Sequence, residues 1–180
     1  MIDDFWLSTL KELVVIGPGV TKPNPSYELV YRLAMSAAFA LNFVFTLGKE
    51  GCWGIHIIGH QLTAQYGIDH GATLSIVTIP FLESQYEARK VLLARSGEYV
   101  FGIKGSIEEQ AKGFIAKLKE FIKTIGQPLK VSEWPDVAIK PGDVDKVTKM
   151  VIKSVGGGNF GYHGSINEAT VKKILTEVIQ

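Results

Sequence analysis

Three of the four histidines lie close together in the sequence, at positions 56, 60 and 70. His56 and His60 are four residues apart, so on a helix they lie on the same face, one turn from each other. Imidazoles that converge from two helices form a reasonable site for a borderline divalent metal such as iron or zinc. Pairs of histidines at this spacing are also common on ordinary helices, as surface or structural residues. The motif H-E-x-x-H of metalloproteases is absent, because Ile57 follows His56.

Local sequence signals indicate how these histidines are positioned. We expect a helix from about Trp53 to Tyr66, broken by Gly67-Ile68-Asp69. Asp69 is a suitable N-cap for a next helix that begins at His70 and bends at Pro80. If the short turn folds this helix back, His70 approaches the face that carries His56 and His60.

The rest of the chain also reads as helix. Apolar residues recur at helical spacing from Ile2 to Leu13, before Gly17-Pro18-Gly19 stops the pattern. A long helix is expected from Ser26 to about Leu47, with Gly48 as its C-cap. Its expected buried stripe consists of Leu33, Ala34, Ala37, Ala38, Leu41 and Phe45.

Two capping boxes mark helices in the second half. Ser106 with Glu109 opens a helix that ends at Gly126, and Ser165 with Glu168 opens the last helix. Between them we expect an extended stretch over 127–141 and a short helix capped by Asp143. No segment alternates with period two for long enough to build a sheet, so the prediction is an all-α helical bundle, a single domain over residues 1–180.

Composition narrows the classes of partner. The 180 residues carry a formal net charge of +1, which argues against nucleic-acid binding through the phosphate backbone. The one cysteine, Cys52, excludes an internal disulfide framework. The acidic start and the short apolar stretch from Leu33 to Leu47 favour a cytoplasmic protein without an export signal or membrane span. The mean hydropathy of +0.16 is slightly apolar, which allows for apolar surface that something else covers.

A longer motif surrounds the histidines. The run His56-Ile-Ile-Gly-His60-Gln-Leu-Thr-Ala, followed by Gly-Ile-Asp-His70-Gly-Ala-Thr-Leu-Ser-Ile-Val-Thr-Ile-Pro80, strongly resembles the signature of the iron-containing (group III) alcohol dehydrogenases. It is most similar to the branch of NADPH-dependent aldehyde reductases and butanol dehydrogenases, and the resemblance extends over essentially the whole chain. It implies the all-α C-terminal domain of a dehydroquinate synthase-like fold.

The resemblance also implies roles for the histidines. His56 and His70 match two ligands of a divalent metal that polarises the alcohol or aldehyde oxygen, while hydride passes to or from a nicotinamide. His60 matches a histidine near cofactor and substrate, with a role in proton relay or substrate orientation. In the family an N-terminal α/β domain binds NAD(P), and an Asp and a His on one helix complete the metal shell.

The sequence departs from this pattern. It lacks the cofactor-binding domain and starts just after the expected Asp and His ligands; Asp3 and Asp4 are followed four residues later by Leu7 and Ser8 rather than by histidine. We therefore expect a weakly held divalent metal (iron or zinc, zinc being retained better), and NAD(P) only where a partner supplies the nucleotide domain. One possible partner is a separately encoded N-terminal cofactor domain, as in a split enzyme. The other is a second copy of the chain, bound through its uncovered apolar face as a homo-oligomer. The alternative is a non-catalytic remnant or interaction module.

Other candidates are weaker. Trp53, just before the histidines, is expected to be a buried core residue, with a place at the border of the substrate cavity as the alternative. His163 is expected to be a solvated loop residue; the family resemblance offers a peripheral role near the active site as the alternative. The run Gly156-Gly157-Gly158-Asn159 follows a helix without a strand, so it is expected to be a connection and not a phosphate loop. Lysines 112, 117, 119 and 123 form a solvated helix face.

Overall fold

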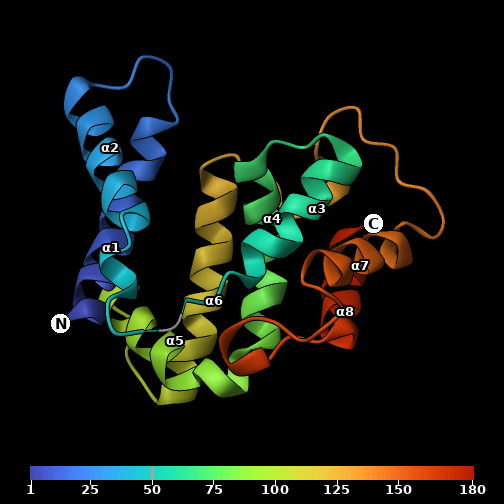
Figure 1. Ribbon diagram of the computed structural model, residues 1–180. Helices are drawn as coiled ribbons and strands as arrows, with labels where there is room; N and C mark the ends of the chain where they lie inside the picture. The colour runs from blue at the N-terminus through green and yellow to red at the C-terminus, as the bar shows by residue number, and fades with distance from the viewer. Residues whose placement is uncertain (50) are drawn as a thin grey trace. The chain divides into compact units, whose positions relative to one another are not determined.

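The computed structural model describes residues 1–49 and 51–180. Its elements are α1 (Ile2–Val20), α2 (Tyr27–Leu41), η1 (Val44–Thr46), α3 (Gly54–Tyr66), α4 (His70–Ser84), α5 (Tyr86–Phe101), α6 (Ile107–Thr124), η2 (Val131–Glu133), α7 (Asp143–Ser154), η3 (Tyr162–Gly164) and α8 (Glu168–Val178) (Figure 1). The β structure of these residues amounts to an isolated antiparallel bridge between Phe160 and Ile166. The all-α prediction is therefore confirmed.

The helices group into two compact units. Unit 1 comprises residues 1–50 and 86–126, and unit 2 comprises residues 51–85 and 127–180. Unit 1 thus holds α1, α2, α5 and α6, while unit 2 holds α3, α4, α7 and α8. Whether the two units together form the single domain expected over residues 1–180 stays a prediction.

Unit 1 is built on the pair α5 and α6, with α1 beside α5 and α2 beside α1 (Figure 1). The capping box predicted for α6 is present: the Ser106 hydroxyl accepts from the Glu109 N–H, and the Glu109 carboxylate accepts from the Ser106 N–H. The apolar residues that recur at helical spacing along α6 predict one buried face, and all of them are buried except Ile107, which is exposed; the buried ones are Ala111, Phe114, Ile115, Leu118 and Ile122. The four lysines on its outer face are exposed, as predicted.

Helix α1 continues through Gly17-Pro18-Gly19 to Val20, so the predicted stop at Gly17 is wrong. The reason is packing. A side chain at Gly17 would meet the Phe121 ring of α6 at 2.8 Å, so the bare glycine lets α1 lie close to α6. Pro18 falls in the last turn of α1. There the packing of Gly17 outweighs the low intrinsic helix propensity of proline and glycine.

Helix α2 differs most from expectation. It ends at Leu41, followed by Phe43 in the left-handed region (φ 65°), so neither the predicted end at Leu47 nor Gly48 as helix C-cap is right. The stripe predicted to be buried is exposed along α2, and the side facing α1 carries Arg32, which donates to the Glu12 carboxylate (Nη2–Oε2 3.0 Å). Apolar side chains remain exposed on α2, namely Tyr27, Val30, Tyr31, Leu33, Met35, Phe39 and Leu41.

The segment Tyr27–Thr46 is long and apolar enough to cross a membrane by length and composition. The α-helix within it has 15 residues, so it measures about 22 Å, against a hydrocarbon core of about 30 Å. The absence of a membrane partner and the cytoplasmic location stay predictions.

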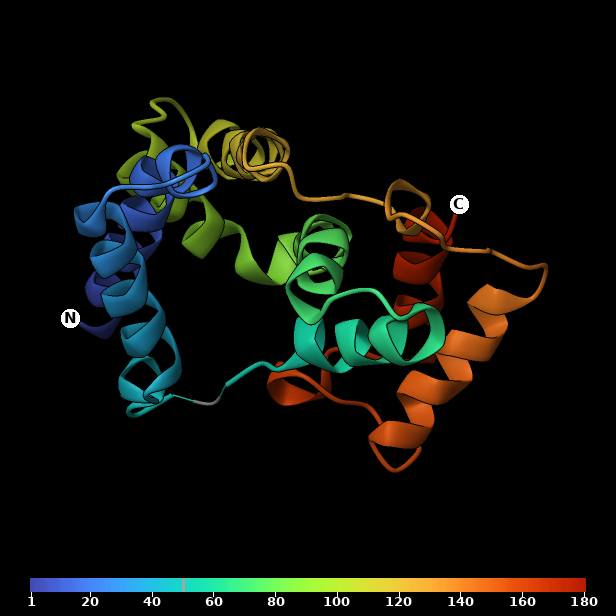
Figure 2. The ribbon, with the colours of Figure 1, turned by 90° about the horizontal axis from the view of Figure 1, so that it is seen from above.

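The four helices of unit 2 can be followed in Figure 2. All four contribute to one continuous apolar core. From α3 and α4 it contains Ile58, Leu62, Ala72, Ile76, Val77 and Phe81, and from α7 and α8 it contains Val147, Val151, Val171, Ile174, Leu175 and Val178. This packing fixes α3 against α4, the two helices that carry the histidine cluster.

Two helix starts in unit 2 correct the predicted caps. Asp143 is the first residue of α7 and not its N-cap; its buried carboxylate accepts from the Lys140 N–H (2.9 Å) and the Tyr66 hydroxyl (3.0 Å), which ties α7 to the end of α3. The N-cap of α8 is Asn167, whose side chain accepts from the Thr170 N–H (2.9 Å). Ser165 instead donates to Gln85 (3.0 Å), because the bridge at Ile166 places it outside the helix.

Candidate metal centre

Helix α3 places two of the three histidines. It starts at Gly54, where a Cβ would meet the Phe81 ring at 2.5 Å and Ile166 Cδ1 at 2.7 Å, so the helix start lies directly on the core. It ends at Gly67 in the left-handed region (φ 71°), whose N–H bonds to the Thr63 carbonyl. The expected helix over 53–66 is confirmed to within one residue.

The turn after Gly67 brings α4 back along α3. Asp69 is the N-cap residue by position, but its side chain makes no capping hydrogen bond. Between His56 and His60, Gly59 allows the close approach, because a Cβ there would meet Leu74 Cδ2 and Thr73 Oγ1 at 3.2 Å. The Thr63 and Thr73 hydroxyls also pair across the two helices at 3.3 Å.

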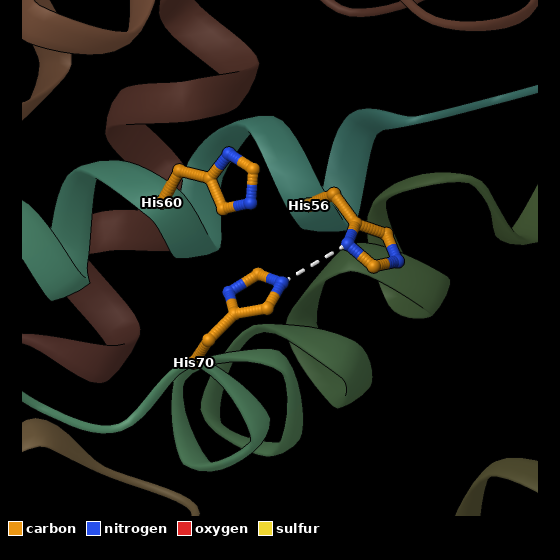
Figure 3. Close-up of side chains that lie close together, drawn as sticks. All are labelled: His56, His60 and His70. Atoms are coloured by element: carbon orange, nitrogen blue, oxygen red, sulfur yellow. Dashed lines mark hydrogen bonds between the residues drawn. The ribbon is translucent and has the colours of Figure 1, made fainter.

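The three histidines converge as the spacing predicts (Figure 3). His56 Nδ1 and His70 Nε2 lie 3.2 Å apart. The ring centroids of His60 and His70 are 4.4 Å apart, and those of His56 and His60 are 6.2 Å apart. One ligand nitrogen from each residue falls in a group whose members all lie within 4.8 Å of one another.

The environment favours the neutral form of two of these imidazoles. Burial lowers the pKa of His56, and the neighbouring His70 and His60 rings lower it further. Burial also lowers the pKa of His70, with His60 adding to the effect. A neutral imidazole keeps the nitrogen lone pair that a metal needs.

The pair His56–His70 fits a tetrahedral metal. On a zinc ion with Zn–N bonds of about 2.0–2.1 Å, two ligand nitrogens lie roughly 3.3–3.4 Å apart. The observed 3.2 Å is close to this spacing. His70 Nδ1 is buried without a hydrogen-bond partner, an arrangement that is costly and uncommon in native structures.

Trp53 corrects another expectation. It is 42% exposed and not a core residue, and its ring meets the His56 ring edge-on, with centroids 5.3 Å apart. This ring contact could have been predicted from the sequence, because Trp53 precedes His56 by three residues and residues at this spacing are neighbours on a helix. Trp53 therefore borders the histidine cluster.

The remaining candidates lie outside the cluster. His163 is exposed in η3 at φ 51°, and the histidine cluster does not include it. Gly156 and Gly157 have positive φ in a turn after α7, as expected of a connection. Within residues 1–49 and 51–180, the candidate metal ligands that come together are three imidazoles without a carboxylate.

Known proteins are similar to this chain in sequence and in fold. Residues 24–179 match the family model of the Fe-containing alcohol dehydrogenase family, C-terminal. The chain is 28% identical over 169 residues to NADP-dependent alcohol dehydrogenase 3 of Entamoeba histolytica, covering 94% of the chain and 41% of that protein. It is 30% identical over 133 residues to the NADPH-dependent aldehyde reductase YqhD of Escherichia coli, covering 73% of the chain and 34% of YqhD.

Solved structures of this family have the same fold as the chain. The crystal structure of Escherichia coli YqhD superposes with a TM-score of 0.89 at 25% identity, covering 98% of the chain and 45% of YqhD. NADH-dependent butanol dehydrogenase A of Thermotoga maritima superposes with a TM-score of 0.88 at 26% identity, covering 99% of the chain and 46% of that protein. The chain thus spans less than half the length of these relatives. With a family match over 24–179 and the same fold throughout, the chain belongs to the Fe-containing alcohol dehydrogenase family, as its C-terminal domain.

Proposed function

We propose that this domain provides the metal-holding half of an NAD(P)-dependent oxidoreductase that interconverts a small alcohol and its aldehyde. The observation that carries the proposal is the 3.2 Å approach of His56 Nδ1 to His70 Nε2, within the family's C-terminal domain. Relatives named as alcohol dehydrogenases, an aldehyde reductase and butanol dehydrogenases support the substrate class.

Each histidine has a distinct role in the proposed enzyme. His56 and His70 hold a divalent metal, iron or zinc, through the two nitrogens that face each other. When bound, the metal supplies Lewis acidity toward the substrate oxygen. His60, exposed on the same helix face, is placed to pass a proton between that oxygen and solvent.

The nicotinamide must be held by other residues than those of this domain. The chain spans 41% of the Entamoeba histolytica relative and 45% of YqhD, and the names of these relatives state NADP and NADPH dependence. We assign the binding of NAD(P) to a partner domain, on the same polypeptide or a separate one. Hydride transfer needs donor and acceptor carbons in contact, so the 180-residue chain alone should not turn over.

A complementation assay tests the proposal. The chain, loaded with Zn²⁺ or Fe²⁺, is mixed with the separately produced N-terminal half of YqhD, and NADPH oxidation with butanal is followed. We expect background rates from the chain alone, and turnover from the mixture that His70→Gln removes and His163→Gln retains. Co-elution of the two halves without turnover, or turnover that survives His70→Gln, would contradict the proposal.

One observation favours a second candidate, a non-catalytic interaction module. Helix α2 leaves seven large apolar side chains exposed. Large exposed apolar patches mark interaction sites. This candidate predicts association through α2 together with no metal binding by the histidine cluster, and a zinc titration separates the two candidates.

A further inference from the structure

Trp53 carries an indole at a position where neither helix capping nor the core requires one. It is the N-cap residue of α3 by position, but its side chain makes no capping hydrogen bond, and small polar residues are preferred there. Its side chain is 42% exposed, so it adds little to the core of unit 2. The contact that accounts for the indole is the one with His56, whose ring it meets edge-on with centroids 5.3 Å apart.

The backbone beneath the indole is firmly held. The Trp53 carbonyl accepts from the Ile57 N–H (2.9 Å), which is the first hydrogen bond of α3. The next residue, Gly54, lies so close to Phe81 and Ile166 of the core that a Cβ there would meet both below 3 Å. The indole is therefore a fixed surface, three residues before His56 and on its side of the helix.

The His56 ring depends on such a surface for its orientation. Rotation about χ2 of histidine is only weakly restricted, and few orientations aim Nδ1 at His70 Nε2, 3.2 Å away (Figure 3). A ligand histidine is usually oriented by a hydrogen bond from its other ring nitrogen to a carboxylate or a backbone carbonyl. Among residues 1–49 and 51–180, the hydrogen-bond partner of the His56 ring is His70 and not such a group. The edge-on indole supplies the restraint that this hydrogen bond usually gives.

We propose that Trp53 is a positioning residue of the metal centre, whose indole holds the His56 ring in the orientation that aims Nδ1 at His70. The inference rests on the proposed metal centre and goes beyond it, since Trp53 acts on His56 and not on the ion. An aromatic pair of this kind changes an equilibrium constant by about 2- to 13-fold. A ring already held in its binding orientation loses less freedom on binding, so zinc affinity depends on Trp53 by a factor of this size.

Zinc titration of the 180-residue chain by calorimetry tests the inference. The variants are Trp53→Ala, which removes the ring, and Trp53→Phe, which keeps an aromatic edge beside His56. Trp6→Ala is the matched control, because Trp6 has a similar exposure of 38% and lies in α1, in unit 1. We expect an affinity about fivefold weaker for Trp53→Ala, and affinities within about twofold of wild type for Trp53→Phe and Trp6→Ala.

NMR contacts between the two imidazoles of the metal-free chain give a second readout, which a general loss of stability would not produce. With Nδ1 aimed at His70, the proton on Cε1 of His56 lies nearer to the His70 ring than the proton on Cδ2 does. We expect a nuclear Overhauser contact from His70 to the Cε1 proton in wild type and Trp53→Phe. In Trp53→Ala the freed ring should add a contact from His70 to the Cδ2 proton.

The controls separate failure of this inference from failure of the metal centre. A Trp53→Ala affinity within about twofold of wild type would overturn the inference alone if His56→Gln and His70→Gln still weaken zinc binding. Equal losses in Trp53→Ala and Trp53→Phe, or ring contacts that Trp53→Ala leaves unchanged, would also overturn it. If wild type binds no zinc, the proposed metal centre fails, and the inference fails with it.

Discussion

Replacement of Gly54 by alanine probes how the first turn of α3 positions the histidines. A Cβ at Gly54 would lie 2.5–2.6 Å from two atoms of the Phe81 ring and 2.7 Å from Ile166 Cδ1. Phe81 is 6% exposed and Ile166 is 0% exposed, so neither side chain has free space to move into. Overpacking of this kind costs about 1–3 kcal/mol, and the helix propensity of alanine offsets at most about 1 kcal/mol of it.

We therefore expect Gly54→Ala to be destabilised by about 1–2 kcal/mol, a fall in Tm of about 2–8 °C for a chain of this size. His56 lies two residues further on, so a shifted helix start should also weaken zinc binding. The matched control is Gly71→Ala in α4, where a Cβ meets nothing within 4 Å; alanine there should be neutral or stabilising by up to about 1 kcal/mol. Thermal and urea unfolding measure both variants. Equal stabilities of Gly54→Ala and wild type, with unchanged zinc affinity, would refute this account of the helix start.

Three further predictions follow from other features. Because burial and neighbouring imidazoles lower the pKa of His56 and His70 in the folded chain, the unfolded chain takes up protons first as the pH falls below about 6.5. Stability of the metal-free chain should therefore decline from pH 7.5 to 5.5, and His70→Gln should reduce this decline; a urea midpoint independent of pH would contradict it. Asn167→Ala should cost about 1 kcal/mol by removing the α8 cap, and Ser165→Ala less, so the reverse order in urea unfolding would restore Ser165 as the cap. The exposed apolar residues of α2 should cause self-association, which light scattering would detect and the double variant Tyr31→Lys/Phe39→Lys should reduce; a clean monomer at high concentration would count against it.

The histidine cluster was predictable because its geometry is local. His56 and His60 lie on one face because residues four apart on a helix do so. The turn between α3 and α4 has only three residues, so α4 must run back along α3. The end of α3 at Gly67 and the capping box of α6 were predictable for the same reason, since each depends on residues within one helical turn.

The features that sequence reasoning missed depend on long-range packing. Periodicity identified an apolar stripe on α2 but not its neighbour, and α1 lies instead against the side that carries Arg32. Likewise α1 runs through Pro18 because Gly17 packs under Phe121, 104 positions away in the sequence. Ser165 lies outside α8 because Ile166 pairs with Phe160 in a bridge that no helix signal encodes, and Asn167, a favourable N-cap residue, caps the helix instead.

The most direct test of the metal centre is the anomalous scattering of zinc in crystals of the zinc-loaded chain. We predict one strong peak at about 2.0–2.1 Å from both His56 Nδ1 and His70 Nε2. The two nitrogens should keep a separation near the present 3.2 Å. A zinc peak that contacts neither nitrogen, under conditions where the chain is folded and saturated with zinc, would contradict the metal-binding role of this domain.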